Sequence, residues 1–143
     1  MLFRSDRGLG PLLGRYPGDV YDGDTDARVG DHPWALCTAN VAELCYDLAV
    51  AVTKGGAVPY EPTSAPFFAL VGVDAQTAVA DAAQRLVDAG DRMLNAIVFH
   101  SDHLELSEQF DGESGYEKSV RNLTWSYAAY LSAARSRTAA LAG

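Results

Sequence analysis

This chain of 143 residues has little of what marks several other protein classes. Basic residues are few, with 11 Lys and Arg against 19 Asp and Glu, for a net charge of -8. Such a surface repels phosphate backbones and anionic lipid, so we expect neither nucleic acid nor a membrane as a partner. No apolar run approaches the length of about 18 residues that spans a bilayer, and residues 1–7 lack the apolar stretch of a signal peptide. The cellular compartment is not predicted.

Metal ligands and catalytic thiols are also scarce, since the chain holds 2 Cys and 3 His. Cys37 and Cys45 fall in one expected helix, about 12 Å apart along its axis, which is too far for a disulfide. Neither has a metal-ligand spacing with a histidine, and no histidine has a Ser, Cys or Asp partner at a triad-like spacing. No Gly-rich phosphate loop follows a strand. We therefore expect no metal site and no cofactor.

What the chain does have is helical periodicity. Residues 1–33 are rich in Gly, Pro and Asp, without an apolar period, and are expected to form a long loop. A helix is expected over 34–53, apolar nearly all round and therefore packed on most sides. A second helix, over 74–100, has apolar residues three and four apart, and a third covers 123–141. The prediction is one all-α domain, or one piece of a larger domain.

The ends of the helices carry signals of their own. Pro33 is expected at the first position of the first helix, and Gly55-Gly56 should end it. Ser64-Ala65-Pro66 predicts a short helix ahead of the second long one. Asn122 is a plausible cap for the last helix.

An extended stretch, Leu106–Asp111, follows the second long helix and has Glu108 at its centre. A hydroxyl, an amide and an aromatic ring flank this carboxylate, as an acid or base residue in a sugar site would require, although most loop Glu residues are simply solvated. Arg15 and Asp19 flank a Pro17-Gly18 turn and could face the same side. They form either a surface ion pair or a pair of groups offered to sugar hydroxyls.

Three blocks of sequence together resemble the C-terminal part of glucoamylases, glycoside hydrolase family fifteen. The blocks are Gly14–Tyr21 followed by His32–Thr38, then Ser107–Asp111, then Leu123–Ala129. Their order and spacing fit the family over nearly the whole chain. The resemblance implies a partial (α/α)6 barrel, about the last third of six helical hairpins, with the active site in a funnel at one end.

By this resemblance the chain is part of a glucan 1,4-alpha-glucosidase. Such an enzyme hydrolyses the α-1,4 bonds of starch, maltooligosaccharides or related α-glucans from non-reducing ends and releases β-glucose with inversion. Glu108 matches the general base, which activates water. Arg15 and Asp19 match residues that hold the glucose at the cleavage point.

The resemblance also suggests roles for neighbouring residues. Trp34 and Trp125 match aromatic residues near the sugar subsites, although Trp125 by its spacing alone is more typical of a packing residue. Gln109 matches a neighbour of the base that reaches a sugar hydroxyl. Cys37 matches a cysteine that is bridged in some fungal members, but its partner is missing here, so we expect a free thiol.

The sequence lacks the second catalytic carboxyl that the resemblance implies, the general acid. Inversion requires two carboxyls roughly 6.5–9.5 Å apart, and the family's general acid lies in an upstream Trp-Glu-Glu block that this sequence lacks. We therefore expect the isolated chain to be inactive on maltose and starch. The alternatives are a non-catalytic glucoamylase-like module that binds sugar or protein, and a helical scaffold without a ligand. Helix faces left uncovered by missing hairpins are expected to cause self-association.

Overall fold

The computed structural model describes residues 2–4, 8–23 and 30–142 of the chain. Its helices are α1 (Ala35–Gly55), α2 (Ala65–Leu70), α3 (Val79–His100) and α4 (Thr124–Leu141). Its strands are short and pair two by two, antiparallel: β1 (Leu2–Arg4) with β2 (Pro11–Leu13), and β3 (Gln109–Phe110) with β4 (Glu117–Lys118). The all-α class predicted from the sequence is confirmed.

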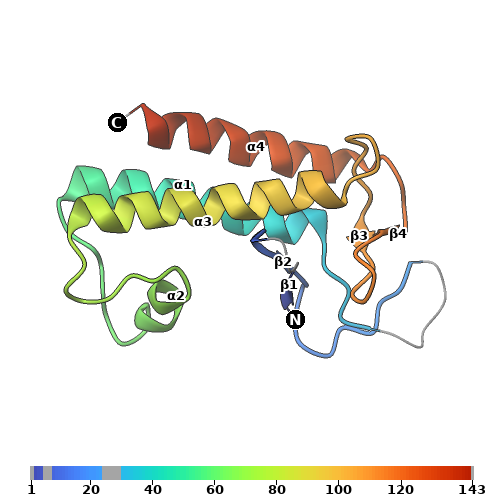
Figure 1. The fold of residues 1–143 in the computed structure, drawn as a ribbon, viewed down its shortest axis with the longest axis horizontal. Coiled ribbons are helices and arrows are strands. Elements are labelled where there is room, and N and C mark those ends of the chain that lie inside the picture. The colour runs from blue at the N-terminus through green and yellow to red at the C-terminus, as the bar shows by residue number, and fades with distance from the viewer. Residues whose placement is uncertain (1, 5–7, 24–29, 143) are drawn as a thin grey trace.

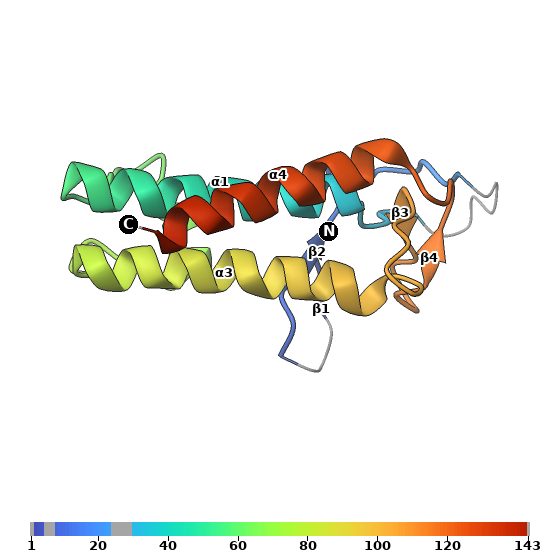
Figure 2. The same ribbon diagram turned by 90° about the horizontal axis from the view of Figure 1, so that it is seen from above.

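Helix α1 is the centre of the core because it packs against both α3 and α4. The three long helices lie side by side in Figure 1, and Figure 2 shows α4 above the gap between α1 and α3. Many buried positions of α1 are alanines, whose small side chains allow close helix packing (Ala35, Ala39, Ala42 and Ala49). By length and composition α1 could also cross a membrane, a property that it shares with core helices of soluble proteins.

The prediction for the ends of α1 is confirmed at its C-terminal end only. Gly56 follows the helix with a φ of 64°, and its N–H donates to the Val52 carbonyl, so the Gly pair does end the helix. At the other end Trp34 occupies the cap position in an extended conformation. The placement of Pro33 at the first helical position was therefore wrong. Trp34 instead forms a bridge with Gln109, which keeps the backbone extended up to the helix.

The starts of α3 and α4 also differ from the prediction. Helix α3 begins at Val79 and not at residue 74, because Asp74 forms a turn in which its carboxylate accepts hydrogen bonds from the hydroxyl of Thr77, at 2.7 Å, and from a nearby backbone N–H. Asn122 does not cap α4. Its side-chain oxygen accepts a hydrogen bond of 2.6 Å from the Tyr127 hydroxyl, and the helix lacks a side-chain cap.

A polar cluster ties the three long helices together. Tyr46 of α1 is fully buried, and its hydroxyl donates to Asp91 Oδ1 of α3 at 2.7 Å. Arg137 of α4 binds both oxygens of the same carboxylate, at 2.7 and 2.9 Å. Gly90 leaves room for the Tyr46 ring, because a Cβ at this position would lie 2.6 Å from the ring carbon Cζ. The cluster fixes the relative rotation of the helices that carry the site.

The N-terminal segment is more ordered than the predicted loop over 1–33. Strands β1 and β2 pair with Leu2 opposite Leu13, and strands of three residues are too short to show a periodicity in the sequence. Strand β2 is anchored to the core, since Leu13 N–H donates to the Thr38 hydroxyl at 2.9 Å and Gly10 N–H donates to the Arg92 carbonyl at 3.0 Å. Residues 5–7 and 24–29 lie outside the described part of the chain.

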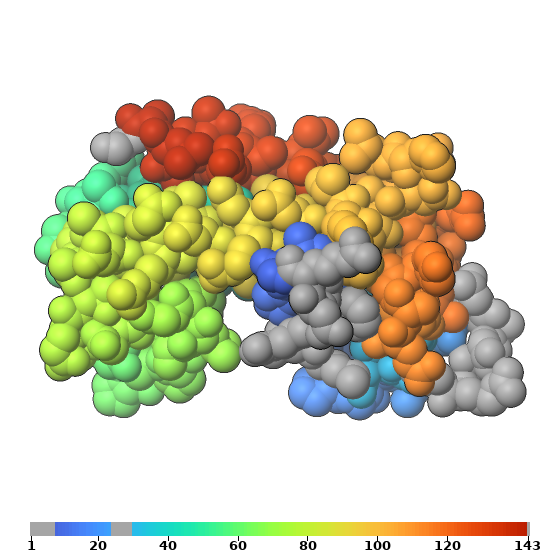
Figure 3. Space-filling model, in the orientation of Figure 1, coloured from blue at the N-terminus to red at the C-terminus, as the bar shows by residue number. Residues whose placement is uncertain are grey.

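Apolar surface remains open on the side of α2. Figure 3 shows a hollow beside the α2 region, and an apolar cavity of about 290 Å³ lies between α2 and the segment of β2. Phe67 and Met93 line it together with Leu70, whose side chain is 74% exposed. Exposed apolar surface of this kind favours association. Self-association of the chain stays a prediction.

Candidate functional site

Backbone pairing fixes the position of Glu108 at the end of α1. The N–H of Glu108 donates to the Val120 carbonyl at 2.8 Å, and its carbonyl accepts from the N–H of Ala35, the first residue of α1, at 3.3 Å. Two residues on, Phe110 N–H donates to the Pro33 carbonyl at 2.8 Å. The extended stretch predicted from the sequence is thus held between the start of α1 and the segment after β4.

The Glu108 side chain is 5% exposed and is held by two hydroxyls. Ser119 donates to Oε2 at 2.5 Å, and Tyr21 donates to the same oxygen at 3.3 Å. Among the described residues, no side chain donates to Oε1. One carboxylate oxygen is therefore fixed by the protein, while the other keeps its lone pairs.

Arg15 and Asp19 bind each other in a two-pronged ion pair. Arg15 Nε and Nη2 donate to the two Asp19 oxygens, both at 2.7 Å. Asp19 is 2% exposed. Asp31 Oδ1 supports it by accepting hydrogen bonds from the N–H groups of Gly18 and Asp19, at 2.8 and 3.1 Å. The hydrogen bonds from Arg15 hold the pKa of the Asp19 carboxyl below its usual value, against the opposing effect of burial. The two residues do face the same side of the turn, but Asp19 is not a surface residue.

Aromatic rings connect this ion pair to Glu108. The Arg15 guanidinium carbon lies 4.4 Å from the centre of the Trp34 ring and 5.0 Å from that of Tyr21, a cation–π arrangement. Trp34 is 5.6 Å from Tyr21 and 6.2 Å from Trp125, centre to centre. Trp34 is buried, whereas Trp125 is 45% exposed. Tyr21 is the common member, since its ring contacts Arg15 and its hydroxyl binds Glu108.

The contacts above join six residues into one wall of the site (Arg15, Asp19, Tyr21, Trp34, Glu108 and Trp125). Gln109 lies behind this wall. Its side chain is fully buried. Its Nε2 donates to the Tyr21 carbonyl at 3.2 Å, and its Oε1 accepts from Gly23 N–H at 3.4 Å. Both ends of the amide are thus bonded to the backbone of the segment that carries Tyr21.

Sequence reasoning missed three residues of the site. Tyr21 lies within the block Gly14–Tyr21, where its phenol shows no sign of a role, and Ser119 lies outside all three blocks. Gly23 packs so closely on Ser119 that a Cβ would lie 1.8 Å from the Ser119 hydroxyl oxygen. The contact of Tyr21 with Glu108 joins positions 87 apart in the chain, and Ser119 reaches the carboxylate with a φ of 68°. Neither feature leaves a signal in a single sequence.

The histidines stay outside this wall. His32 is buried; its Nδ1 accepts from Gly112 N–H at 3.1 Å, and its Nε2 lies 3.5 Å from Asp22 Oδ2. Asp22 is also 3.1 Å from Lys118 Nζ. Within the described ranges no group of three His, Cys, Asp or Glu gathers to hold a metal ion. Cys37 and Cys45 are free thiols.

Comparison with models of protein families identifies the family of the chain. The model of glycosyl hydrolases family 15 matches residues 3–135. The chain belongs to glycosyl hydrolase family 15. Glucoamylase 1 of Rhizopus oryzae is 31% identical to this family 15 chain over 142 residues, which cover 92% of the chain and 23% of the relative. The probable glucoamylase of Schizosaccharomyces pombe is 32% identical over 138 residues, covering 94% and 30%.

Solved structures agree with this assignment. The glucoamylase from Saccharomycopsis fibuligera matches with a TM-score of 0.81 and 29% identity, over 98% of this chain and 32% of its own. The Hormoconis resinae glucoamylase matches with a TM-score of 0.75 and 28% identity, over 93% and 23%. The family 15 chain thus spans between 23% and 32% of the length of these four relatives. Its three-helix core is a piece of their (α/α)6 barrel, as the sequence predicted.

Proposed function

We propose that this family 15 chain is the base-bearing part of a glucan 1,4-alpha-glucosidase that acts on starch, maltooligosaccharides or related α-glucans. One observation supports the proposal above all others. A buried carboxylate, Glu108, is fixed through one oxygen and stands in one wall with the Arg15–Asp19 pair and the rings of Trp34 and Trp125. A carboxylate, charged hydrogen-bonding groups and aromatic faces together are the features of a sugar-hydrolysing site.

In this proposal Glu108 is the general base. Because both hydroxyl donors use Oε2, Oε1 accepts a proton from a water molecule. The oxygen of that water attacks the anomeric carbon on the face opposite to the leaving group, the glucosidic bond breaks, and β-glucose is released with inversion. A general acid about 6.5–9.5 Å away protonates the leaving oxygen. We assign that acid to a part of the barrel outside these 143 residues.

Arg15 and Asp19 would hold the glucose unit at the cleavage point. Asp19 accepts hydrogen bonds from Nε and Nη2 of Arg15, and Nη1 donates no hydrogen bond within the described part of the chain. This N–H group is thus the donor for sugar hydroxyls. Stacking on Trp34 keeps the guanidinium plane in place. Trp34 and Trp125 would limit the sugar subsites on one side.

Gln109 has a supporting role in this proposal. Its bonds to the backbone of Tyr21 and Gly23 hold the Tyr21 phenol against Glu108. Direct contact of Gln109 with a sugar hydroxyl, which the resemblance suggested, would require the amide to leave both bonds. We therefore propose that Gln109 positions Tyr21 and does not bind substrate itself.

The alternative is a non-catalytic glucoamylase-like module that binds sugar or protein. Titration calorimetry with maltose, combined with an assay for released glucose, tests the two proposals. We expect the isolated chain to bind maltose weakly and to release no glucose. Arg15→Ala should abolish the binding, whereas Arg135→Ala, an exposed arginine on α4, should preserve it. Glucose release at enzyme-like rates by the isolated chain would refute the assignment of the acid to another part of the barrel. Absence of any heat with maltose would favour a scaffold without a ligand.

A further inference from the structure

A second cluster of polar side chains lies beside the wall that carries Glu108. Asp22 Oδ1 lies 3.1 Å from Lys118 Nζ, and Asp22 Oδ2 lies 3.5 Å from His32 Nε2. Little water reaches these side chains, whose exposed fractions are 2% for Asp22, 0% for His32 and 13% for Lys118. The function proposed above gives none of the three a role.

The hydrogen bond of His32 to the backbone fixes its tautomer. Its Nδ1 accepts from the Gly112 N–H at 3.1 Å, so the proton of the imidazole is on Nε2, the nitrogen that faces Asp22. His32 therefore points an N–H group at Asp22, and Lys118 brings a positive charge to the same carboxylate. The cluster joins the loop of Asp22, the segment before α1 and the β3–β4 hairpin.

Each end of the Asp22–Lys118 ion pair is next to a residue that binds Glu108. Asp22 directly follows Tyr21, and Lys118 directly precedes Ser119. The hydroxyls of Tyr21 and Ser119 are the two donors to Glu108 Oε2. The ion pair therefore joins the two segments at the points from which these donors project.

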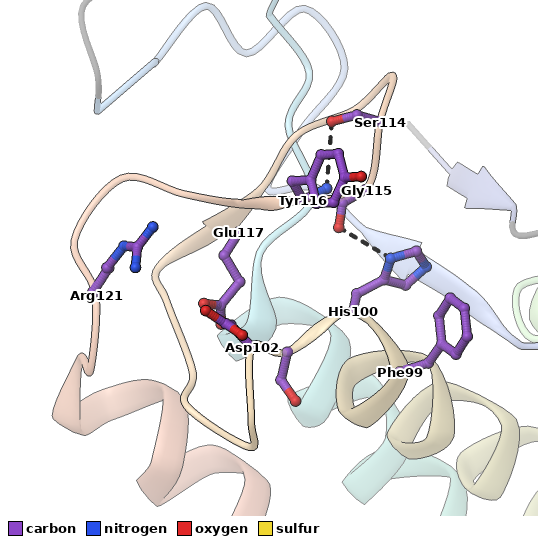
Figure 4. A pocket seen from close by; sticks show the side chains of 9 residues that line it. Phe99, His100, Asp102, Ser114, Gly115, Tyr116, Glu117 and Arg121 are labelled. Carbon is purple, nitrogen blue, oxygen red and sulfur yellow. Dashed lines mark hydrogen bonds between the residues drawn. The ribbon is translucent and has the colours of Figure 1, made fainter.

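The geometry of strand β4 explains how Lys118 reaches Asp22. Successive side chains of a strand point to opposite faces. The preceding residue, Glu117, lines a cavity beside the C-terminal end of α3 together with Asp102 (Figure 4), and its Oε1 accepts from the Ser107 N–H at 3.1 Å. Lys118 consequently points to the other face of the strand, where it meets Asp22.

The backbone of Ser119 depends on support from its surroundings. Its φ of 68° lies in the left-handed region, which a residue with a side chain keeps only where neighbouring contacts hold it. The ion pair of Lys118 provides one such contact. Gly23, which follows Asp22, packs directly on the Ser119 hydroxyl. A shift of the Asp22 segment would therefore also move Ser119.

A buried ion pair is weak evidence for stability, because the desolvation of its two charges offsets most of their attraction. Its place next to both donors favours another role. We propose that the Asp22–Lys118 pair is a positioning element for Glu108, which holds the hydroxyls of Tyr21 and Ser119 on Oε2 and so leaves Oε1 to the attacking water. Both residues act through their neighbours and do not contact the sugar. The role of Glu108 as the base rests on the function proposed above.

The first test is hydrogen exchange of the full chain, followed by mass spectrometry. Lys118→Met removes the charge and keeps a side chain of similar length. We expect exchange about tenfold faster in residues 106–111, where the Glu108 N–H is bonded to the Val120 carbonyl, and unchanged exchange in residues 39–52 of α1.

Three further variants make this test specific. The double variant Asp22→Asn/Lys118→Met leaves no uncompensated buried charge, so it should fold and show the same faster exchange. Lys118→Arg keeps the charge and should restore the exchange rate of the wild type. Lys54→Met is the matched control, because Lys54 is the other lysine of the chain and lies exposed in the last turn of α1. It should change nothing in residues 106–111.

The second test is the kinetics of a completed barrel, in which this chain replaces the matching segment of the Saccharomycopsis fibuligera glucoamylase. Lys118→Met should lower kcat on maltose by about tenfold. It should leave KM within about twofold of the parent value, because Arg15 and Asp19 still hold the sugar. Lys118→Arg should recover kcat. A purely structural ion pair would instead lower the melting temperature and leave kcat per folded molecule unchanged.

Two results would overturn the positioning role. One is exchange that rises equally in residues 106–111 and 39–52, or in neither; the other is a folded Lys118→Met barrel with the kcat of its parent. Either result would leave the hydrolase proposal in place. A barrel in which Glu108→Gln keeps the parent rate would refute the hydrolase proposal, and the exchange rates would then decide alone whether the pair holds the Glu108 segment.

Discussion

Replacement of Gly90 by alanine is expected to destabilise the three-helix core, although alanine is the better helix former. At an open helix position this change stabilises a protein by about 1 kcal/mol. At Gly90 the new methyl carbon would lie 2.6, 2.7 and 3.1 Å from three ring atoms of Tyr46. Tyr46 is fully buried, and its hydroxyl is bonded to Asp91. The ring therefore cannot move aside freely.

The expected cost follows from these overlaps. Overpacking costs about 1–3 kcal/mol, and three short contacts place this site near 3 kcal/mol. After the gain in helix propensity, the net loss is about 2 kcal/mol. Urea unfolding followed by circular dichroism measures it. Gly55→Ala, with nothing within 4 Å of its added carbon, is the matched control and should be neutral or slightly stabilising. A Gly90→Ala variant as stable as wild type would refute the packing described for Tyr46.

Two further predictions concern acid stability and the support of Glu108. The pKa values of Asp19 and Asp91 are lowered, mainly by hydrogen bonds from Arg15 and Arg137. The two ionised carboxylates therefore stabilise the folded state fully above the unfolded pKa of about 3.9. This stabilisation is lost as the pH falls through the lower pKa of the folded state. The free energy of unfolding should therefore drop below about pH 4, and Asp91→Asn should show a smaller drop between pH 6 and pH 3 than wild type; an equal drop would contradict the assigned cause. Gly23→Ala should displace Ser119 from Glu108, since its Cβ would lie 1.8 Å from the Ser119 hydroxyl oxygen, and should lower hydrolysis by the completed barrel at least about tenfold. Unchanged hydrolysis, as expected for the Gly55→Ala control, would show that the Ser119 bond is dispensable.

The core could be predicted from the sequence because it depends on repeating patterns. The apolar positions of α1, α3 and α4 recur over long stretches, and their periods survive local exceptions. The starts of these helices were less accurate. Pro33 and Asn122 match the composition of helix starts, but a bridge at Trp34 and a hydrogen bond from Tyr127 give the backbone other partners.

The candidate site was predictable only in part. The register of separate blocks predicts a site made of Glu108, Arg15, Asp19, Trp34 and Trp125. The structure brings these residues together through contacts with Tyr21 and Trp34, and their roles stay a prediction. The groups that hold Glu108 were not found, because their contacts depend on the folding of distant loops.

The central claim is that Glu108 activates water in a family 15 barrel of which this chain is one piece. The direct test is a chimera in which this chain replaces the matching segment of the Saccharomycopsis fibuligera glucoamylase, to which it is similar with a TM-score of 0.81. We predict that the chimera releases β-glucose from maltose and that Glu108→Gln lowers the rate at least about 100-fold, as expected for loss of a general base. A folded chimera that releases no glucose, or a Glu108→Gln variant that retains the parent rate, would contradict the claim.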